Sequence, residues 1–358
     1  MDVSVAVYFL EDTEADISRR QLRDMTNVLE MPTNEFVKKF RVSKEIFTML
    51  LETLRNKWEP MHRRTYIRPD IKLATFLRFL VSGSYQQTVG NEVVSSTSKT
   101  SVGRILRECL TLFDEWICNK WIKPPTAEEQ QQTIDAFLDK TGFPGVIGCV
   151  DGTHIRIKGP GENMKHLYYN GMGYYSINVM VSLQQICDQN MNITYVEGTH
   201  PGSSNDSSVW EASEVSQKIQ QEFEQGKRNF WVLGDADYKL KPYLMTPFSK
   251  PSDTAEVLYN KKHASTHNVV KRCLKLLTNK FECLIGIRGL HYPPDRANQI
   301  IGSCCALHNM CIKYKCLDVL ESSCTSPEIP ISKNKADENE VKEDITAAAI
   351  RRRIAINL

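Results

Sequence analysis

The sequence has no long hydrophobic run and no strong excess of charge of either sign. No stretch approaches the ~18 consecutive apolar residues of a membrane-spanning helix, which excludes a transmembrane chain. The chain has 45 Lys and Arg residues and 43 Asp and Glu residues, which gives a formal net charge of +2. This charge argues against a uniformly basic nucleic-acid-binding protein but does not exclude local basic patches. The start, MDVSVAVYFLEDTEAD, lacks the basic segment of a secretory signal, so we expect an intracellular chain.

Paired cysteine motifs are missing as well, although cysteine itself is not rare. The 11 cysteines are an odd number, and none forms the C-x2-C pair of a zinc ribbon. Most lie in apolar runs such as IIGSCCALHNMCI, which favours buried free thiols in a reducing compartment. A disulfide framework is an alternative, as is a zinc site, but neighbouring helical residues point in different directions and make a poor tetrahedral set. The zinc candidates are Cys304, Cys305, His308 and Cys311.

The length and composition are those of an ordinary globular protein. The chain has 358 residues, of which 41% are hydrophobic and 25% are charged. At ~100–200 residues per domain, this length predicts two domains and a tail. We expect an N-terminal extension over residues 1–33 and a tail over residues 319–358. The tail contains the acidic segment DENEVKED, is expected to be largely disordered, and ends in a short helix.

Residues 34–122 are expected to be helical and to resemble a DNA-binding domain. Apolar residues recur at three- and four-residue steps in EFVKKFRVSKEIFTMLLETL, Ser43 is a plausible N-cap, and a later helix is expected to stop at Gly83. Helix, turn and helix over about residues 84–110 match the outline of a helix-turn-helix. Its DNA-binding candidates are Lys99, Arg104 and Arg107, although any helical bundle contains such pieces. Six basic residues over 55–72 could follow a phosphate backbone or belong to a solvated linker.

After the segment PPTAEEQQQ, which is typical of a connection, the pattern changes to strands. GFPGVIGCVDGTHIRIKG is an apolar, β-rich run, two more strands flank a turn near 188–190, and NFWVLGDADY contains a further short strand. STHNVVKRCLKLLTNKFECLI and RANQIIGSCCALHNMCIKY have helical periodicity. We therefore expect an α/β domain over residues 135–318.

Two aspartates stand where strands of this domain end. Asp151 follows the apolar run GCV, and Asp235 follows VLG. A carboxylate at the end of a buried strand needs a cation or backbone donors, and two of them on adjacent strands can hold divalent metal ions for phosphoryl transfer. The alternative is that each side chain caps the turn that follows, because Asp-Gly and Gly-Asp sequences form turns.

Five segments, taken in order, resemble a known family. They are GVIGCVDGTHIRIKGP, HPGSSNDSSVW, WVLGDADYKLKPYLMTPF, EVLYNKKHASTHNVVKRCLKLLTNKFECL and CCALHNMCI. This series resembles the motifs of PIF/Harbinger-type transposases and most closely the domesticated Harbinger transposase-derived nucleases of animals. RVSKEIF, LRFLVSGSYQQTVG and SVGRIL are similar to that family's helical region, so the resemblance covers roughly residues 34–315.

The resemblance implies a fold, a chemistry and partners. It implies an RNase H-like (DDE transposase-type) catalytic domain in which Asp, Asp and Glu hold two Mg²⁺ or Mn²⁺ ions for DNA cleavage, without transposition. By motif, the catalytic and metal-binding aspartates are Asp151 and Asp235, and Asp206 matches a further metal-site carboxylate. The family also implies a Myb/SANT-like partner protein and a nuclear location with a cytoplasmic pool.

The third acidic position carries a charge reversal. Where the family has Glu after its HxxTxxVV pattern, this chain has Lys271. Glu282 lies 11 residues further, about 16 Å along a helix at ~1.5 Å per residue, which is too far for the same ion, and Glu256 lies outside the motif. An ammonium there would repel a second cation, or it could take that cation's place against Asp151 and Asp235.

Three further features have both a structural and a functional interpretation. His154 fits the strand pattern but could touch substrate, and Asp237 is expected to face solvent or the turn but could add a metal ligand. Tyr168, Tyr169, Tyr174 and Tyr175 are typical of a sheet edge but could stack on nucleic acid.

The sequence leaves two main functions open: a metal-dependent nuclease acting on DNA, or a catalytically inactive DNA-binding adaptor that lost cleavage at Lys271. An unrelated metal phosphohydrolase is a more distant third.

Overall fold

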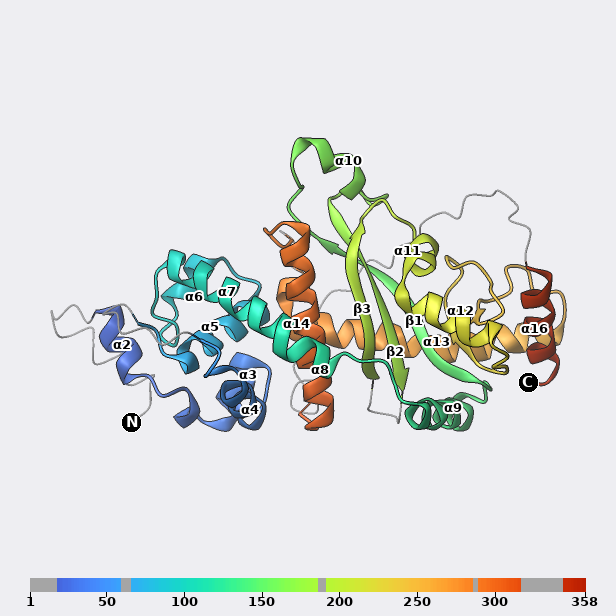
Figure 1. Cartoon of the computed structure of the whole chain (residues 1–358), viewed down its shortest axis with the longest axis horizontal. Helices are drawn as coiled ribbons and strands as arrows, with labels where there is room; N and C mark the ends of the chain where they lie inside the picture. Colours follow the sequence, from blue (N-terminus) through green and yellow to red (C-terminus); the bar gives the residue numbers. More distant parts are fainter. Residues whose placement is uncertain (1–17, 59–65, 186–190, 286–288, 317–343) are drawn as a thin grey trace.

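The computed structural model of the chain describes residues 18–58, 66–185, 191–285, 289–316 and 344–358. Figure 1 shows a group of N-terminal helices at one end of an elongated molecule and a twisted sheet in its middle. Helix α14 (Pro294–Lys313) stands between these two parts, and the long helix α13 (Thr254–Lys280) runs along the sheet. This arrangement confirms a helical region followed by a mixed α/β region.

The helical region is built from short amphipathic helices with clear local signals. Ser43 accepts a hydrogen bond from the backbone N of Ile46 and begins α4 (Lys44–Leu54), as predicted. Gly83, at φ +57°, ends α5 (Pro69–Ser82), because a residue without Cβ adopts the left-handed conformation at little cost. The other elements are α2 (Arg19–Met25), η1 (Val28–Glu30), α3 (Thr33–Phe40), α6 (Gln86–Asn91), α7 (Lys99–Phe113), the π-helical turn η2 (Asp114–Cys118) and α8 (Asn119–Trp121).

The segment PPTAEEQQQ differs from its sequence-based interpretation as a connection. Helix α9 (Ala127–Thr141) begins inside it. Thr126 accepts from the backbone N of Glu129, and the Glu129 side chain accepts from the backbone N of Thr126. This capping box pairs two backbone donors that would otherwise lack a partner, and it explains why a polar, Gln-rich segment forms a helix.

The sheet has five strands in the order β3-β2-β1-β4-β5. Strands β1, β2 and β3 pair antiparallel, whereas β4 runs parallel to β1 and β5 parallel to β4. The turn expected near residues 188–190 lies outside the described residues. The strands are β1 (Val146–Arg156), β2 (Ser176–Gln185), β3 (Met191–Pro201), β4 (Trp231–Leu233) and β5 (Leu244–Met245).

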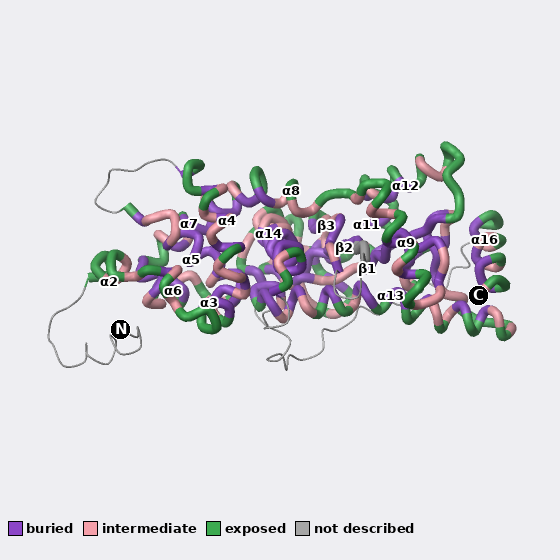
Figure 2. Tube along the Cα trace, turned by 90° about the horizontal axis from the view of Figure 1, so that it is seen from below, coloured by how far each residue is buried: buried purple, intermediate pink, exposed green. Residues whose placement is uncertain are grey.

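Helices cover both faces of this sheet. Cys149 of β1 and Leu233 of β4 point into the larger core with α13 and α14. Val150 follows Cys149, and Val232 precedes Leu233. Both valines point into a smaller core with α11 (Asp206–Ala212) and α12 (Glu214–Glu224). The alternation follows from the two-residue period of a strand. Figure 2 shows that α12 leaves much of its length exposed, as expected for a helix that covers the outside of a sheet.

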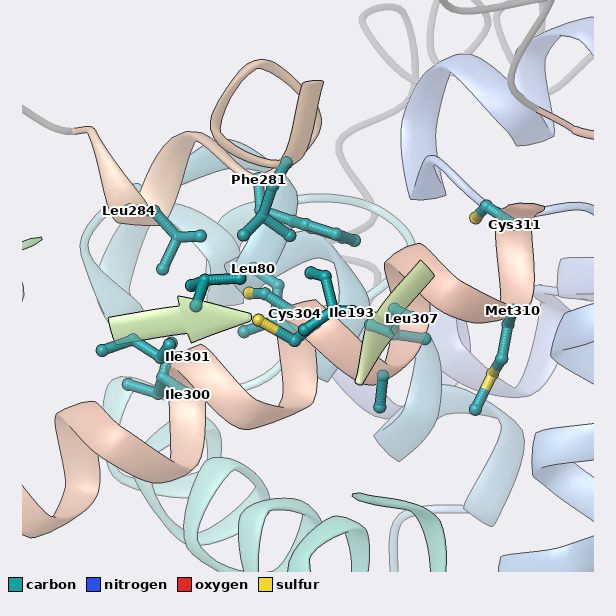
Figure 3. Close-up of a cluster of buried hydrophobic side chains, with 14 of the residues drawn as sticks. Leu80, Ile193, Phe281, Leu284, Ile300, Ile301, Cys304, Leu307, Met310 and Cys311 are labelled. Atoms are coloured by element: carbon teal, nitrogen blue, oxygen red, sulfur yellow. The ribbon is translucent and has the colours of Figure 1, made fainter. Parts of the chain in front are cut away.

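The larger core is continuous between the helical region and the sheet. Leu80 of α5, Ile193 of β3, Phe281 after α13 and Leu307 of α14 belong to the same buried cluster. Figure 3 shows these side chains around α14, together with Leu284 of η4 (Glu282–Leu284). Because α14 contributes to both sides, the helical region and the sheet are held in a fixed relation.

The chain ends in helix α16 (Ile345–Ile356), as the sequence predicted, and this helix docks on the protein. Ala347, Ile354 and Ala355 of α16 are buried in the larger core. Arg351 is 5% exposed and stacks over Phe248 at 4.1 Å. Residues 317–343, where the disordered part of the tail is expected, lie outside the described part of the chain.

The cysteines follow the free-thiol interpretation throughout the part of the chain that the structure describes. All nine that it contains are free, and every one except half-buried Cys118 is buried. Among those residues no group of three or more His, Cys, Asp or Glu side chains is placed to hold a metal ion, so the alternative zinc site at Cys304, Cys305, His308 and Cys311 is wrong. None of the described helices has both the length and the apolar character that crossing a bilayer requires.

Candidate active site and nucleic-acid interface

The sheet register brings Asp151 and Asp235 to the same level. Cys149 of β1 pairs with Leu233 of the parallel strand β4, and each aspartate lies two residues beyond its member of this pair. Asp151 shares the face of Cys149, which α13 covers. On that face the Cys149 thiol lies 3.7 Å from the carbonyl of Thr266 in α13. Asp235 lies just beyond the end of β4, close enough to Asp151 to raise its pKa. The two carboxylates therefore lie side by side.

Both aspartates also accept local backbone hydrogen bonds. The backbone N of Gly152 donates to Asp151 Oδ1 at 3.1 Å, and the backbone N of Asp237 donates to Asp235 Oδ1 at 3.0 Å. The second bond closes the turn that follows β4. The turn-capping interpretation thus holds for Asp235 alone. Asp151 lies in the middle of β1 (Val146–Arg156), so the expectations that a strand ends there and that its side chain caps a turn are wrong.

Asp206 approaches this edge from the opposite face of the sheet. It is the first residue of α11, is 5% exposed, and accepts a hydrogen bond from Asn178 Nδ2 at 2.7 Å. A Cβ on Gly152 would lie 2.5 Å from its carboxyl group. Only glycine at position 152 therefore allows this carboxylate to rest against the β1 backbone, directly beside Asp151.

Burial and mutual repulsion raise the pKa of several acids in this cluster. Burial is the main cause for Asp151, whose pKa lies well above the usual range, and Asp235 raises it further. Burial raises the pKa of Asp206, and it raises that of Asp237 to about 6, where Asp235 and Asp206 also contribute. The positive charge of Lys271 lowers the pKa of both Asp151 and Asp237. The cluster is therefore acidic and only partly compensated.

A tyrosine that the sequence-based prediction missed lies within this acidic cluster. Tyr238 is 4% exposed, and its hydroxyl has no hydrogen-bond partner. Burial raises the pKa of Tyr238 well above the usual range. Four nearby carboxylates raise it further, and Asp206 makes the largest of these contributions. An unpaired buried hydroxyl costs about 1–3 kcal/mol, so its presence beside the carboxylates calls for an explanation.

Helix α13 positions Lys271 through a series of ring contacts. Tyr259, His263, His267 and Lys271 follow one another at four-residue steps on one side of the helix, and each ring stacks on the next at 5.9 Å. His267 Nε2 donates to the carbonyl of Val150 at 2.9 Å, and His263 Nε2 donates to that of Met245 at 3.1 Å. Burial lowers the pKa of both imidazoles to about 4, so both are neutral. They fix the helix beside Asp151.

The two other acids that could replace the missing glutamate lie elsewhere. Glu256 accepts from the backbone N and the hydroxyl of Ser252 and from Arg352 near the start of α13. It precedes Lys271 by 15 residues, about 22 Å along the helix at ~1.5 Å per residue. Glu282 lies beyond the end of α13, in η4. No carboxylate in these two segments takes the position of Lys271.

The remaining candidates have structural partners. His154 Nδ1 lies 3.0 Å from the hydroxyl of Ser176, and burial lowers its pKa to about 4. Tyr168 is buried, Tyr169 packs edge-on against Tyr175 at 5.4 Å, and Arg156 lies 4.2 Å over the ring of Tyr174. This arrangement favours the structural interpretation of His154 and of the sheet-edge tyrosines.

The segment in which a helix-turn-helix is predicted contains α6, a turn and α7. Lys99, Arg104 and Arg107 are all exposed on α7. The turn is held from behind by α2, since Arg19 donates to the carbonyl of Thr97 at 2.9 Å and Arg23 to that of Ser96 at 2.6 Å. These contacts leave the three basic side chains of α7 free to face a ligand.

Only part of the basic segment over 55–72 is available for a ligand. Lys72 is buried and bonds Glu108 at 2.7 Å, and Arg68 bonds Asp70 and the carbonyl of Thr26. Arg63 and Arg64 lie outside the described residues. Within the described part, Arg55 and Lys57 are exposed, and Lys57 also stacks over Trp116 at 3.5 Å.

Comparisons with known proteins place the chain in a family. Residues 150–309, which include Asp151, Asp206, Asp235 and Lys271, match the family model described as DDE superfamily endonuclease. The human protein named "Putative nuclease HARBI1" is 33% identical over 316 residues, covering 87% of this chain and 85% of its own length.

Proteins from other organisms match as well. The protein of the same name from Xenopus laevis is 34% identical over 75% of each chain, and "Protein ALP1-like" from Arabidopsis thaliana is 26% identical over 67% of this chain and 60% of its own. The chain therefore belongs to the Harbinger transposase-derived branch of the DDE superfamily endonucleases.

Proposed function

We propose that the protein binds DNA and hydrolyses its phosphodiester bonds with the help of a divalent metal ion, on an RNase H-like domain. The observation that supports this proposal is the proximity of Asp151 and Asp235, each of which lies two residues beyond the paired residues Cys149 of β1 and Leu233 of β4. Family membership supports the reaction class, because the matched model is that of an endonuclease.

The chemistry of the cluster fits a divalent ion at Asp151 and Asp235. Several buried or half-buried carboxylates raise one another's pKa, and a cation removes that repulsion. The Tyr238 hydroxyl lacks a partner within the same cluster, and so does Asn178 Oδ1 beside Asp206. When bound there, Mg²⁺ or Mn²⁺ would act as a Lewis acid on the phosphate and stabilise the charge that develops during cleavage.

The same cluster does not fit a second ion equally well. The described side chains do not converge into a set of three or more ligands, and the third-acid position holds a half-buried lysine. A cation close to the Lys271 ammonium would be repelled. We therefore assign Asp151 and Asp235 as the ligands of one ion, with Asp206 adding negative charge from the other face.

DNA binding is assigned to α7. Lys99, Arg104 and Arg107 present three exposed positive charges on one helix, and the turn that precedes it is held by α2. Contacts of this kind to phosphates supply affinity without sequence information. A Myb/SANT-like partner and a nuclear location stay predictions of the family resemblance.

Lys271 favours a second candidate function, that of a DNA-binding adaptor that keeps the fold without cleavage. Its charge already lowers the pKa of Asp151, so it takes part of the role that a metal ion has in a nuclease. In this case Lys271 replaces the second cation and stabilises the cluster in the absence of metal.

Nicking of a supercoiled plasmid in Mg²⁺ or Mn²⁺ separates the two functions. If the protein is a nuclease, the wild-type chain nicks the plasmid and the Asp151→Ala variant does not. If it is an adaptor, only Lys271→Glu nicks it. Wild-type activity that survives in Asp151→Ala would contradict the assigned site. Lys275→Glu, an exposed lysine one turn further along α13, is the matched control for the charge change.

A further inference from the structure

A groove of about 930 Å³ lies between the helix-turn-helix and the sheet region, outside the carboxylate cluster. One wall is formed by the end of α5, the start of α6 and the first residue of α7, and the other by η4 and residues 289–292. Its volume is in the ~300–1,000 Å³ range of pockets that hold small ligands, so it suits a nucleotide-sized group rather than a duplex.

The floor of the groove is fixed by contacts between its two walls. Gln86 Nε2 donates to the hydroxyl of Tyr292 at 2.9 Å, and Phe79 packs edge-on against Tyr292 at 5.8 Å. Gly83 lets the backbone of Glu282 and Cys283 approach, since a Cβ there would lie 3.0 Å from it. The groove is therefore preformed, and a ligand would not have to order its walls.

The rim combines an aromatic surface with positive charge. Tyr85 is 52% exposed, and its ring lies 5.9 Å from that of exposed His291. Lys99 is exposed at the start of α7. Among the described residues that line the groove, none carries a carboxylate. An exposed ring and an ammonium group that line the same groove are the two groups that bind the base and the phosphate of a single strand.

We propose that this groove binds one unpaired nucleotide of a DNA strand, stacking its base on Tyr85 and holding its phosphate with Lys99. The proposal rests on the proposed function for its choice of DNA. Lys99 also begins the helix assigned to duplex binding, so the groove would take a nucleotide at the junction between a duplex and a single strand. Leu290, in the far wall, exchanges backbone hydrogen bonds with Arg156 and Lys158 at the end of β1. Arg156 lies five residues beyond Asp151, about 16 Å at ~3.3 Å per residue, so the groove is near the candidate active site.

Fluorescence anisotropy with labelled oligonucleotides tests this assignment. The full chain is titrated in EDTA with a blunt duplex, the same duplex carrying a short dT overhang, and a dT single strand. Chelation prevents cleavage, so the measurement is independent of nuclease activity. We expect tighter binding to the overhang duplex than to the blunt one. Tyr85→Leu should weaken overhang binding about tenfold, since stacking contributes ~1–3 kcal/mol per base, and should change blunt-duplex binding less than about twofold.

Two matched variants keep the result specific. Tyr85→Phe retains the ring and should bind like the wild type, and Tyr66→Leu removes another exposed tyrosine, at 41%, which precedes the start of α5 and does not line the groove. Lys99→Met should weaken binding of both duplexes. Equal affinity of the wild type for blunt and overhang DNA would overturn the proposal, as would unchanged overhang binding by a folded Tyr85→Leu protein. If the protein nicks DNA but does not prefer an overhang, the proposed function holds and only the proposed role of the groove is wrong.

Discussion

Two groups of acidic residues contact helix α13, and they differ in how their charge is compensated. At the start of the helix, Arg352 of α16 bonds Asp253 at 2.5 Å and Glu256 at 3.1 Å. Its guanidinium lowers the pKa of Asp253 to about 2. Further along the helix, burial and neighbouring carboxylates raise the pKa of Asp151 and Asp237 instead, and Lys271 lowers them only in part. The first group stabilises the docking of α16, whereas the second destabilises the folded, metal-free protein.

The difference has a geometric cause. A guanidinium presents several donors in a plane and bonds two carboxylates of the same turn directly, whereas Lys271 is a single ammonium that acts through space on a buried cluster. A buried group of like charges is tolerated where it has a use, because proteins keep costly groups mostly at functional sites. The comparison therefore favours the second group, and not the first, as the candidate functional site.

The largest expected effect comes from reversing the charge of Lys271. We expect Lys271→Glu to bind Mn²⁺ more tightly than the wild type, because a third carboxylate replaces a repelling ammonium. At ~100 times the dissociation constant, bound Mn²⁺ should stabilise the variant by about 3 kcal/mol, against less than ~1 kcal/mol for the wild type. Thermal unfolding with and without Mn²⁺ measures this. Lys275→Glu should respond to Mn²⁺ like the wild type. Equal stabilisation by Mn²⁺ in all three proteins would show that residue 271 does not affect metal binding at the cluster.

The next effect separates the two groups of acids by their contributions to stability. We expect Asp151→Asn to stabilise the metal-free protein by on the order of 2 kcal/mol, since it removes a buried charge repelled by its neighbours. Asp253→Asn should instead lower the melting temperature, because it breaks the contact with Arg352. Urea unfolding in EDTA measures both changes. Asp139→Asn, at an exposed position of α9, is the control. Loss of stability in Asp151→Asn would show that its carboxylate is already compensated.

The smallest effect is a pH dependence attributable to Asp237. Its folded-state pKa of about 6 lies above the ~4 of an unfolded chain, so the folded protein holds the extra proton between these values. Stability should therefore fall as the pH rises from about 4 to about 6. Because Asp237 is partly exposed, we expect on the order of 1 kcal/mol after screening. Comparing unfolding of the wild type and Asp237→Asn across this range, in EDTA, checks it, and identical pH profiles would contradict the assignment.

Local signals in the sequence predicted the elements well where each signal acts on its own residues. Ser43 as an N-cap and Gly83 as a helix stop are confirmed, because a cap depends on one side chain and the adjacent backbone. The interpretation of PPTAEEQQQ as a connection was wrong, although the capping box of Thr126 and Glu129 that begins α9 is a local signal too. The polar composition of this segment is typical of a loop and concealed the pattern.

The candidate site was only partly visible in the sequence. An expected position at a strand end, together with the motif, selected Asp151 and Asp235, and the motif alone selected Asp206. Where each carboxylate lies relative to the sheet depends on strand register and on α11, and Asp151 in fact lies in the middle of β1. Tyr238 carried no signal, because a buried tyrosine close to a motif is usually part of a core. Its significance depends on the carboxylates around it and on its unpaired hydroxyl.

The sequence by itself determined the family, the order of helical and strand regions, and the lysine at position 271, because these depend on residue types and their spacing. The tertiary structure alone decided how charge is distributed around α13. Pairing across long sequence separations joins Arg352 to Asp253 and places Lys271 beside Asp151. Burial, which is the largest cause of the raised pKa of Asp151, Asp206 and Asp237, exists only after the chain has folded. The near balance of 45 basic and 43 acidic residues thus conceals one compensated group of acids and one that is not.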